Sequence, residues 1–228
     1  MSKRARSTLK ILLVGSKGRM GREVSRLRGV KVVARANDPS DWDQLRPQGI
    51  DVVIDFSLPE GLNQALDWCL KYKRPLVSGT TGLSPSLRRK LRRVAKRVPV
   101  LYSANMSLGI AALNQMIRSL GPLASWRFEI SEIHHKRKKD KPSGTALLLA
   151  EQLQSATGRK PSQIVSYRKG DVVGIHTLLA ASPDESISLN HTAKKRRIFA
   201  SGAVHAARWL IDKGKPGLYD LSDLYQTK

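Results

Sequence analysis

The segment from His134 to Thr145 gathers side chains that can transfer protons and hold anions. His134 and His135 stand together at the end of a predicted strand, so they should project to opposite sides of it. One of them can then face a reaction while the other contacts a ligand. Because the imidazole pKa lies near 6.5, either ring suits proton transfer close to neutral pH.

Positive charge and a helix start follow the two histidines. Cations clustered around Lys138 would attract a dianionic substrate, and they can lower the pKa of a lysine so that it acts as an acid. Ser143, Gly144 and Thr145 open the next predicted helix, where N–H groups and hydroxyls can hold a carboxylate. The same residues also fit a solvated basic loop with a helix cap, and residue chemistry alone leaves both interpretations open.

A metal site is not expected in this segment. No cysteine or carboxylate stands at the usual ligand spacing from the two histidines. We therefore predict acid–base chemistry without a bound metal.

A glycine-rich loop forms the second candidate site. It runs from Gly15 to Gly21, directly after a predicted strand and before a helix. Gly15 permits a tight turn, Gly18 lets the backbone approach a pyrophosphate, and Gly21 allows the helix to pack closely on the strand. The order strand, loop, helix favours a dinucleotide site over a plain structural turn.

The residues around this loop leave the coenzyme open between NADH and NADPH. Asp38 is predicted to end the second strand, where a carboxylate accepts hydrogen bonds from the adenosine ribose of NADH. Lys17 and Arg19 could instead contact the 2′-phosphate of NADPH. Asp38 also fits a turn before Pro39.

Two later loops should lie at the same edge of the sheet. They follow the fourth and fifth predicted strands, and open parallel sheets bind ligands outside the carboxyl ends of their strands. Their residues are Gly79, Thr80 and Thr81 in one loop and Ser103, Ala104, Asn105 and Met106 in the other.

The elements that would position these loops alternate between strand and helix. The expected strands are Lys10–Val14, Val30–Ala36, Asp51–Phe56, Leu76–Ser78 and Val98–Leu101, with helices beginning at Met20, Pro59 and Pro85. Strands separated by helices predict parallel pairing with right-handed crossovers. The fold class is therefore α/β, with a Rossmann-like doubly wound parallel sheet.

The pattern changes in the second half of the chain. A helix (Leu108–Leu120), a strand (Trp126–His134) and a helix (Gly144–Ala156) precede three strands, Ile164–Arg168, Gly174–Ala181 and Glu185–His191. Short turns between strands favour a mixed sheet. From Ala200 to Lys228 the chain is predicted to return to helix. We expect an inserted α+β substrate domain at 106–197, with 1–105 and 198–228 forming the dinucleotide-binding domain.

Composition adds one unusual feature, a net charge of +23 from 41 Lys and Arg against 18 Asp and Glu. Many cations fall on the expected outer face of one helix: Arg88, Arg89, Lys90, Arg92, Arg93, Lys96 and Arg97. A solvated helix face explains them better than a nucleic-acid site, because no aromatic residues alternate with them. The single cysteine, Cys69, fits a reducing compartment. No stretch approaches the roughly 20 apolar residues of a membrane span, so we expect a cytoplasmic protein without a membrane partner.

Motifs along nearly the whole chain resemble those of the 4-hydroxy-tetrahydrodipicolinate reductase family, also called dihydrodipicolinate reductases, of bacterial lysine and diaminopimelate biosynthesis. They are GSKGRMG at Gly15, VVIDFS at Val52, SGTTG at Ser78, SANMSLG at Ser103, HHKRKKDKPSGTA at His134, RKGDVVGIHT at Arg168 and FASGAVHAARWL at Phe199. The segment at His134 is the most specific of them.

The resemblance implies a role for each matched residue. His134 corresponds to the proton donor and acceptor, with Lys138 as a companion donor. The substrate carboxylates would be held by His135, Ser143, Gly144 and Thr145, and Arg196 falls where the family has a cation near the ligand. The dinucleotide contacts would be Gly15, Ser16, Lys17, Gly18, Arg19, Met20, Asp38, Gly79, Thr80, Thr81, Ser103, Ala104, Asn105 and Met106.

The implied reaction is hydride transfer from NADH or NADPH to a cyclic imine that carries two carboxylates. Family members are usually homotetramers built through the second domain. The chain departs from the family pattern at Met106, where phenylalanine is usual, in a short first helix, and in its high positive charge. The alternative is a non-catalytic, basic relative that binds nucleic acid, a partner that we do not expect.

Overall fold

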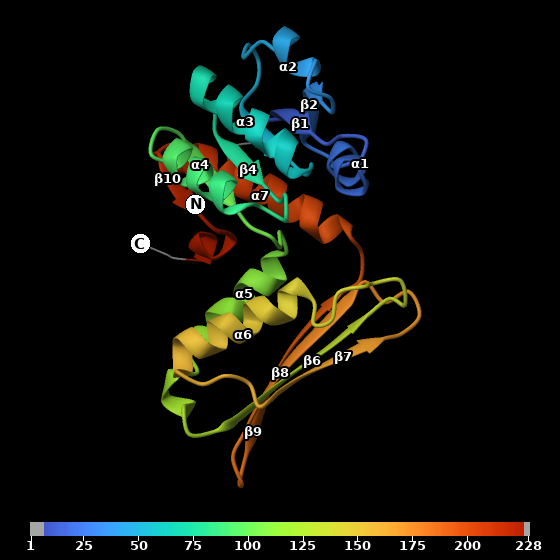
Figure 1. Cartoon of the computed structure of the whole chain (residues 1–228), viewed down its shortest axis with the longest axis vertical. Coiled ribbons are helices and arrows are strands. Elements are labelled where there is room, and N and C mark those ends of the chain that lie inside the picture. The colour runs from blue at the N-terminus through green and yellow to red at the C-terminus, as the bar shows by residue number, and fades with distance from the viewer. Residues whose placement is uncertain (1–6, 226–228) are drawn as a thin grey trace. The chain divides into compact units, whose positions relative to one another are not determined.

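The computed structural model describes residues 7–225. The chain forms two compact units (Figure 1). Unit 1 comprises Met1–Met106 and Arg197–Lys228, and unit 2 comprises Ser107–Arg196. The second unit is thus inserted into the first, and the chain passes between them after Met106 and after Arg196.

Unit 1 is built on a six-stranded sheet in the order β10-β5-β4-β3-β1-β2, in which every pair is parallel. The strands are β1 (Leu9–Val14), β2 (Val30–Ala36), β3 (Val52–Asp55), β4 (Leu76–Ser78), β5 (Pro99–Tyr102) and β10 (Gly217–Tyr219). All four residues of β3 are buried, as expected for a parallel sheet covered on both faces. The predicted doubly wound α/β fold is confirmed.

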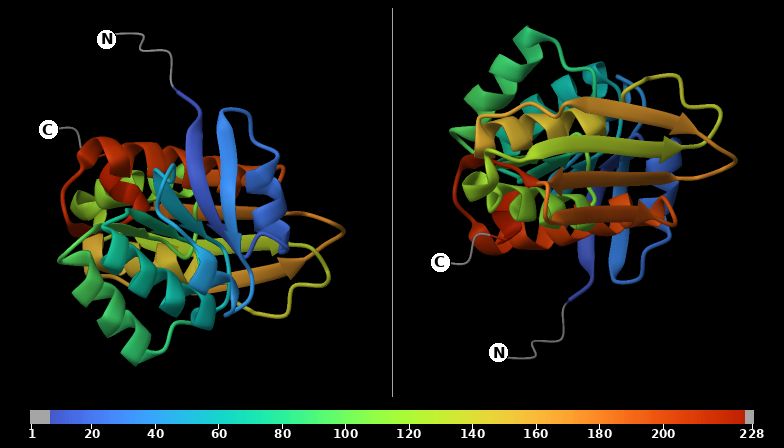
Figure 2. Two further views of the ribbon diagram at one scale, coloured as in Figure 1. Left: turned by 90° about the horizontal axis from the view of Figure 1, so that it is seen from above. Right: turned by 90° about the horizontal axis from the view of Figure 1, so that it is seen from below.

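Helices cover both faces of this sheet (Figure 2). They are α1 (Arg19–Ser25), α2 (Asp41–Gln44), α3 (Pro59–Tyr72), α4 (Pro85–Ala95) and α7 (Arg197–Lys213), and a 3-10 turn, η2, spans Leu221–Tyr225. Leu66 of α3 and Leu91 of α4 share one apolar cluster with Leu12 and Val53 of the sheet. On the opposite face α7 lies along β3, β4 and β5.

The prediction that the tail returns entirely to helix is wrong. Helix α7 ends at Lys213, where Gly214 takes a positive φ of 61° and Pro216 cannot supply the N–H that a continuing helix needs. The next residues instead form β10, which pairs with β5 at the sheet edge. The strand has only three residues, Gly217–Tyr219, and so short a pattern does not distinguish a strand from a turn.

Unit 2 contains a four-stranded sheet in the order β7-β6-β8-β9. Its elements are α5 (Leu108–Arg118), η1 (Gly121–Leu123), β6 (Arg127–His134), α6 (Gly144–Thr157), β7 (Gln163–Arg168), β8 (Gly174–Ala181) and β9 (Ser186–Ala193). β6 pairs with β7 in parallel across α6, whereas β6–β8 and β8–β9 are antiparallel. The predicted mixed sheet is therefore confirmed.

Both long helices of unit 2 pack against one face of this sheet (Figure 1). Ile117 of α5 and Leu149 of α6 bury against Phe128, Ile130 and Leu178 of the strands. Residues alternate along β6 between buried and half-buried, starting from Phe128. The buried row continues past the apolar core to two polar residues, Glu132 and His134, at the end of the strand.

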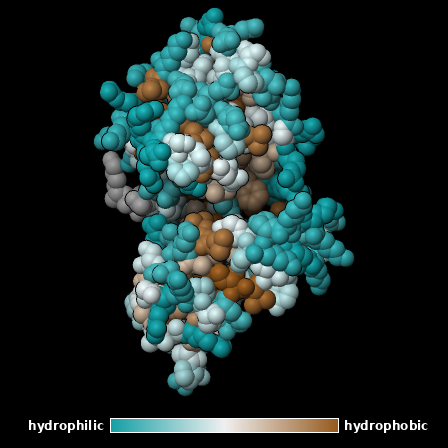
Figure 3. All heavy atoms as spheres, in the orientation of Figure 1, coloured by the Kyte–Doolittle hydropathy of each residue, from teal (hydrophilic) through white to brown (hydrophobic). Residues whose placement is uncertain are grey.

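The surface of unit 1 carries much of the positive charge. In α4, Leu87, Leu91 and Val94 are buried, while Arg89 and Arg93 are exposed. The basic residues thus occupy the outer face of an amphipathic helix, as the spacing predicts. Figure 3 shows hydrophilic residues over most of the visible face of unit 1. Among residues 7–225, none of the helices has the length and apolar character needed to cross a membrane.

Candidate functional site

One row of residues across the unit 1 sheet aligns the predicted cofactor loops. Val14 pairs with both Ala36 and Asp55, Asp55 pairs with Ser78, and Ser78 pairs with Tyr102. These five residues end β2, β1, β3, β4 and β5. The loops that follow them therefore start at the same edge, on both sides of the point where the strand order reverses at β1. Such an edge is the usual ligand site of an open parallel sheet.

The glycine loop is closely packed against its neighbours. Gly15 has φ of +76°, and a Cβ there would lie 2.4 Å from the carbonyl oxygen of Phe56. A Cβ at Gly21 would lie 2.3 Å from the carbonyl oxygen of Gly15, so the helix start can approach the loop only without side chains. Gly18 is exposed and its N–H donates to the Gly15 carbonyl at 3.1 Å. The loop thus keeps an open backbone surface, which a pyrophosphate requires.

Asp38 does not end β2, contrary to the prediction. The strand stops at Ala36, and Asn37 takes the position next to the glycine loop. Its Oδ1 accepts from the Ser16 hydroxyl at 3.0 Å and from the Lys17 N–H at 3.2 Å. Asp38 lies in the exposed turn beyond, 3.5 Å from the Lys17 ammonium group. The predicted bounds of the strand, Val30–Ala36, are correct. The Asp41 carboxylate accepts from the N–H groups of Asn37 and Asp38 and so holds the turn that follows.

A buried carboxylate, Asp55, organises the next two loops. It accepts from the hydroxyls of Ser57 at 2.5 Å, Ser78 at 2.6 Å and Thr80 at 2.8 Å, and from the Ser57 N–H at 3.0 Å. Burial raises the pKa of Asp55, although the three hydroxyls oppose that shift. The sequence motifs contain Asp55 and Ser57, but only the folded sheet shows that they fix the loop at Thr80.

The remaining predicted cofactor residues lie in these loops with varied exposure. Gly79 packs on the Phe56 ring, because a Cβ there would lie 2.5 Å from Cε1. The Ser103 N–H donates to the Ser78 carbonyl at 3.1 Å, which joins the β5 loop to the β4 loop. Met106 is buried. Among the other predicted contacts, Arg19, Thr81 and Ala104 are exposed, Met20 and Asn105 are half-buried, and Thr80 is buried.

A second cluster of functional groups lies in unit 2, at the end of β6. Glu132 and His134 are two residues apart and so share the buried face of the strand. His176 of β8 is opposite Glu132 in the sheet register. Oε2 of Glu132 lies 3.4 Å from Nδ1 of His134 and 3.8 Å from Nε2 of His176. The two rings meet edge to face, with centroids 4.9 Å apart.

Arg168 connects this cluster to the basic loop. Its Nη2 donates to Oε1 of Glu132 at 3.2 Å, and both side chains are buried. Its Nε donates to the Lys138 carbonyl at 3.2 Å, and Nη2 also donates to the Asp140 carbonyl. The Lys138 ammonium group contacts both carboxylate oxygens of Asp140 at 2.7 Å. The loop with the predicted proton donor is therefore anchored by an arginine from β7.

The predicted substrate-holding residues stand at the start of α6. Ser143 caps the helix, because its Oγ accepts from the Ala146 N–H at 3.2 Å, and its own N–H donates to Oε1 of Glu132 at 3.0 Å. Gly144 is exposed, and His135 and Thr145 are half-buried. Unlike its neighbours, Ser143 is fully buried, and its Oγ is also 3.3 Å from Nε2 of His176.

Burial controls the protonation of this cluster. It lowers the pKa of His134 below the usual value, although the Glu132 carboxylate opposes the shift. It lowers the pKa of His176 to about 4, with a further contribution from His134. Burial alone would raise the pKa of Glu132, but hydrogen bonds, chiefly to Ser143, leave it below the usual value. Glu132 is consequently an anion between two imidazoles that are neutral near pH 7.

A carboxylate does lie beside the histidines, contrary to the expectation from the sequence. Glu132 does stand beside the histidines, since Glu132, His134 and His176 each place one ligand-type atom within 4.8 Å of the others. The guanidinium of Arg168, however, already compensates the carboxylate, and Lys138 adds positive charge near His134. This charge disfavours a divalent cation beside the three residues.

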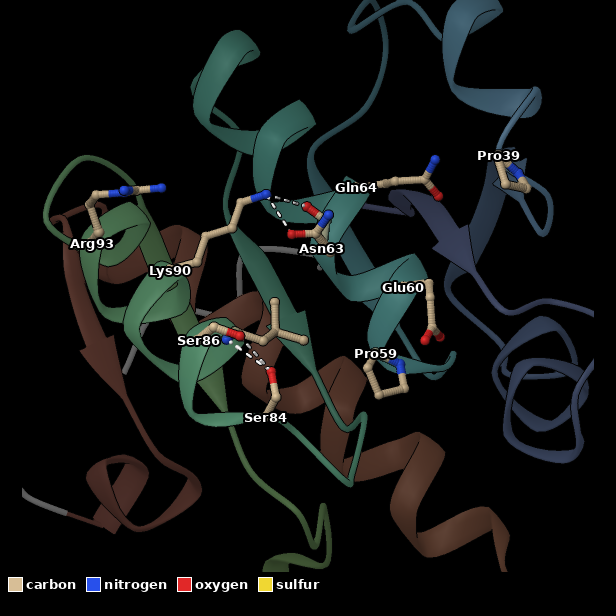
Figure 4. Close-up of a pocket in the computed structure, with 10 residues that line it drawn as sticks. Pro39, Pro59, Glu60, Asn63, Gln64, Ser84, Ser86, Lys90 and Arg93 are labelled. Atoms are coloured by element: carbon tan, nitrogen blue, oxygen red, sulfur yellow. Dashed lines mark hydrogen bonds between the residues drawn. The ribbon is translucent and has the colours of Figure 1, made fainter.

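Unit 1 also has a separate hollow of about 630 Å³ between α3 and α4 (Figure 4). On one wall the Lys90 ammonium group contacts Asn63 and Asp67, each at 2.7 Å. The lining includes Pro39 and Pro59, which follow the ends of β2 and β3. The hollow therefore adjoins the cofactor edge but contains none of the predicted site residues.

Sequence reasoning missed Glu132, Arg168, His176 and Asn37 as site residues. Arg168 and His176 stand within a motif recognised in the sequence, but their contacts with Glu132 depend on the pairing of β6 with β7 and β8. The alternation of polar residues with apolar ones along β6 was a signal for Glu132. A buried-face position two residues before His134 predicts contact with it.

Comparisons with known proteins agree with this picture. Residues 9–106 match the family model "Dihydrodipicolinate reductase, N-terminus", and residues 106–225 match the corresponding C-terminus model. A 4-hydroxy-tetrahydrodipicolinate reductase of Bdellovibrio bacteriovorus is 42% identical, covering 95% of this chain and 96% of that protein. One of Xanthomonas euvesicatoria is 40% identical, with 96% and 98% covered. A dipicolinate-bound dihydrodipicolinate reductase structure from Paenisporosarcina sp. TG-14 has a similar fold, with a TM-score of 0.77, 19% identity and coverage of 95% and 99%.

Proposed function

The chain belongs to the dihydrodipicolinate reductase family, and we propose that it reduces 4-hydroxy-tetrahydrodipicolinate, through dihydrodipicolinate, to tetrahydrodipicolinate in lysine and diaminopimelate biosynthesis. It is an NAD(P)H-dependent oxidoreductase by family. The observation that carries the proposal is the cluster at the end of β6, which holds an acid–base histidine beside a helix start. The family match in both halves favours this activity over the nucleic-acid-binding alternative.

The residues of unit 1 fit a dinucleotide. The open glycine loop would lie along the pyrophosphate of the coenzyme. The loops fixed by Asp55 would surround its nicotinamide end. A reduced nicotinamide supplies a hydride when bound there. Both NADH and NADPH are proposed as coenzymes, because Asp38 offers a ribose acceptor while Lys17 and Arg19 offer cations for a 2′-phosphate. The Lys17–Asp38 pair is exposed and long at 3.5 Å, so either partner is available to a ligand.

The residues of unit 2 fit a small cyclic imine with two carboxylates. His135, Ser143, Gly144 and Thr145 would hold the carboxylates at the start of α6, and this grip would orient the ring. Arrival of a hydride at C4 leaves an electron-rich enamine, which requires a proton. His134 would donate that proton from Nε2, with Lys138 assisting. The negative charge of the substrate would favour the imidazolium form that burial alone disfavours.

A homotetramer is proposed as the assembly. The helices of unit 2 cover one face of its sheet, while Ile133, Ile175 and Leu179 lie on the other face and are half-buried. Tyr167 on the same face is 54% exposed. A sheet face of this kind is a suitable subunit interface. We also propose a cytoplasmic location, for which the single, buried thiol of Cys69 is the supporting feature.

The activity test follows the oxidation of NADH and of NADPH with the full-length protein and substrate generated by a coupled synthase. We expect loss of reduced coenzyme that depends on both the synthase and the protein, with tetrahydrodipicolinate as the identified product. Absence of oxidation with both coenzymes, in a folded sample, would contradict the proposed function. Steeply salt-dependent DNA binding, abolished by neutralising Arg89, Arg93 and Arg97, would support the rival instead.

A further inference from the structure

We propose that Glu132 is the positioning residue for His134: Oε2 accepts a hydrogen bond from the Nδ1–H group of the imidazole, so that the reacting proton is carried on Nε2. The inference rests on the proposed function, which makes His134 the proton donor. Glu132, a buried carboxylate outside the predicted site, would fix both the His134 ring and the loop beside it.

The first support is a pair of complementary buried atoms. Oε2 of Glu132 and Nδ1 of His134 lie 3.4 Å apart, and neither has a hydrogen-bond partner among residues 7–225. An unsatisfied buried acceptor or donor costs about 1–3 kcal/mol. The two atoms are already within hydrogen-bonding distance, so a small rotation of the ring that points Nδ1–H at Oε2 would satisfy both atoms at once. Contacts of catalytic residues commonly tighten in this way when substrate binds.

The second support is the space at the other ring nitrogen. Nε2 of His134 faces Gly174, where an added Cβ would lie only 3.0 Å from that atom. Glycine at this position leaves room beside Nε2. With Nδ1 turned toward Glu132, Nε2 is the nitrogen available for proton transfer, and the carboxylate stabilises the imidazolium that must exist before transfer.

The third support is that the two carboxylate oxygens of Glu132 contact different groups. While Oε2 faces the histidine, Oε1 accepts from the Ser143 N–H at 3.0 Å and from Arg168 at 3.2 Å. Arg168 in turn holds the carbonyls of Lys138 and Asp140. One buried carboxylate therefore sets the histidine ring, the lysine-bearing loop and the start of α6 relative to one another.

His176 competes only weakly for the same oxygen. Its Nε2 is 3.8 Å from Oε2 of Glu132 but 3.3 Å from the Ser143 hydroxyl. Burial lowers the pKa of His176 to about 4, so it stays neutral at the pH of the proposed reaction. The histidine that gains most from the carboxylate is therefore His134, which the reaction requires in its charged form.

The test reads the tautomer directly. The full-length protein is labelled with ¹⁵N-histidine, and the His134 ring signals are assigned by their loss in His134→Gln. Nitrogen chemical shifts and two-bond couplings distinguish a protonated Nδ1 from a protonated Nε2 in the neutral ring. We expect the Nδ1–H form in the wild type. Predominance of the Nε2–H form would overturn the inference.

Kinetics of Glu132→Gln provide the second readout, with Glu129→Gln as the matched control. Glu129 is on the same strand but on its other face, paired with Arg127. For Glu132→Gln we expect kcat to fall by about a hundredfold with the coenzyme KM unchanged, while Glu129→Gln keeps wild-type kcat. A folded Glu132→Gln that retains kcat within about threefold would also overturn the inference.

These outcomes separate the inference from the proposed function. If the wild-type enzyme is active but His134 is in the Nε2–H form, the proposed function stands and the inference about Glu132 is wrong. If the wild-type protein is inactive but His134 is in the Nδ1–H form, the proposed function is wrong, and the contact between Glu132 and His134 is still supported. The tautomer is measured in the wild type, so the test stands even where Glu132→Gln fails to fold.

Discussion

Arg168 donates through Nη2 to Oε1 of Glu132 at 3.2 Å, and both side chains are buried in unit 2. The pair joins the ends of two parallel strands, β6 and β7. Because Arg168 also holds the carbonyls of the basic loop, the stability of the unit and the geometry of the proposed active site depend on the same contact.

Replacing Arg168 with leucine should destabilise unit 2. The change leaves the Glu132 charge buried without its partner, and breaking a buried ion pair on one side costs about 3–5 kcal/mol. Urea unfolding followed by circular dichroism measures the loss. The control is Arg137→Leu, which removes an exposed pair with Asp171 and should leave the transition in place. Equal transitions for the two variants would contradict the role given to Arg168.

Stability should fall as the pH drops from about 6.5 to about 4, in part because of His176. Burial lowers the pKa of this ring from its usual 6.5 to about 4 in the folded chain. Between these values the unfolded state binds a proton that the folded state does not, so acid favours unfolding. The resulting loss in the free energy of unfolding is roughly 3 kcal/mol at the lower end of this range. Above pH 6.5 this ring causes no loss.

His176→Gln tests this contribution. His134 and His191 shift in the same direction, so the informative quantity is the difference in pH slope between wild type and variant. Urea unfolding at several pH values should give a flatter dependence for His176→Gln. The matched control, His205→Gln, changes an exposed histidine of α7 and should retain the wild-type slope. A wild-type slope in His176→Gln would refute the assignment.

Asp55→Ala should weaken coenzyme binding. The carboxylate accepts from the hydroxyls of Ser57, Ser78 and Thr80, so its removal frees the loops after β3 and β4. We expect the Kd for NADH, measured by fluorescence titration, to rise about tenfold, or roughly 1.4 kcal/mol. Asp67→Ala removes an exposed carboxylate of α3 and should leave Kd unchanged. An unaltered Kd in folded Asp55→Ala would mean that these loops do not contact the coenzyme.

Much of the fold could be predicted because its signals are local. The alternation of strand and helix, and Pro85 after the Ser84 cap, lie within short windows of sequence. The contacts of Glu132 with Arg168 and His176 could not be predicted in the same way. They connect residues 36 and 44 positions apart, and only the strand register brings them together.

Local competition explains the smaller errors. Asp38 was expected at the end of β2, but the strand stops two residues earlier, at Ala36. In the turn that follows, the Asp41 carboxylate accepts from the N–H groups of Asn37 and Asp38. A side chain that bonds nearby backbone often replaces the last strand contacts in this way. Because of this turn, Asn37 rather than Asp38 contacts the glycine loop.

Coenzyme choice should respond in opposite senses to two single changes. Lys17→Ala removes a cation available to a 2′-phosphate and should lower kcat/KM for NADPH by about threefold to tenfold. Asp38→Ala removes a ribose acceptor and should lower kcat/KM for NADH by a similar factor. Steady-state assays with both coenzymes measure the ratio. If each variant affects both coenzymes equally, the two residues do not discriminate between them.

In the proposed reaction, the cluster at the end of β6 performs the proton transfer. The measurement that tests it most directly is kcat of His134→Gln against wild type, with substrate from the coupled synthase. We predict that the folded variant loses about 10²–10⁴-fold in kcat, with substrate KM nearly unchanged. A folded His134→Gln with wild-type turnover would contradict the account.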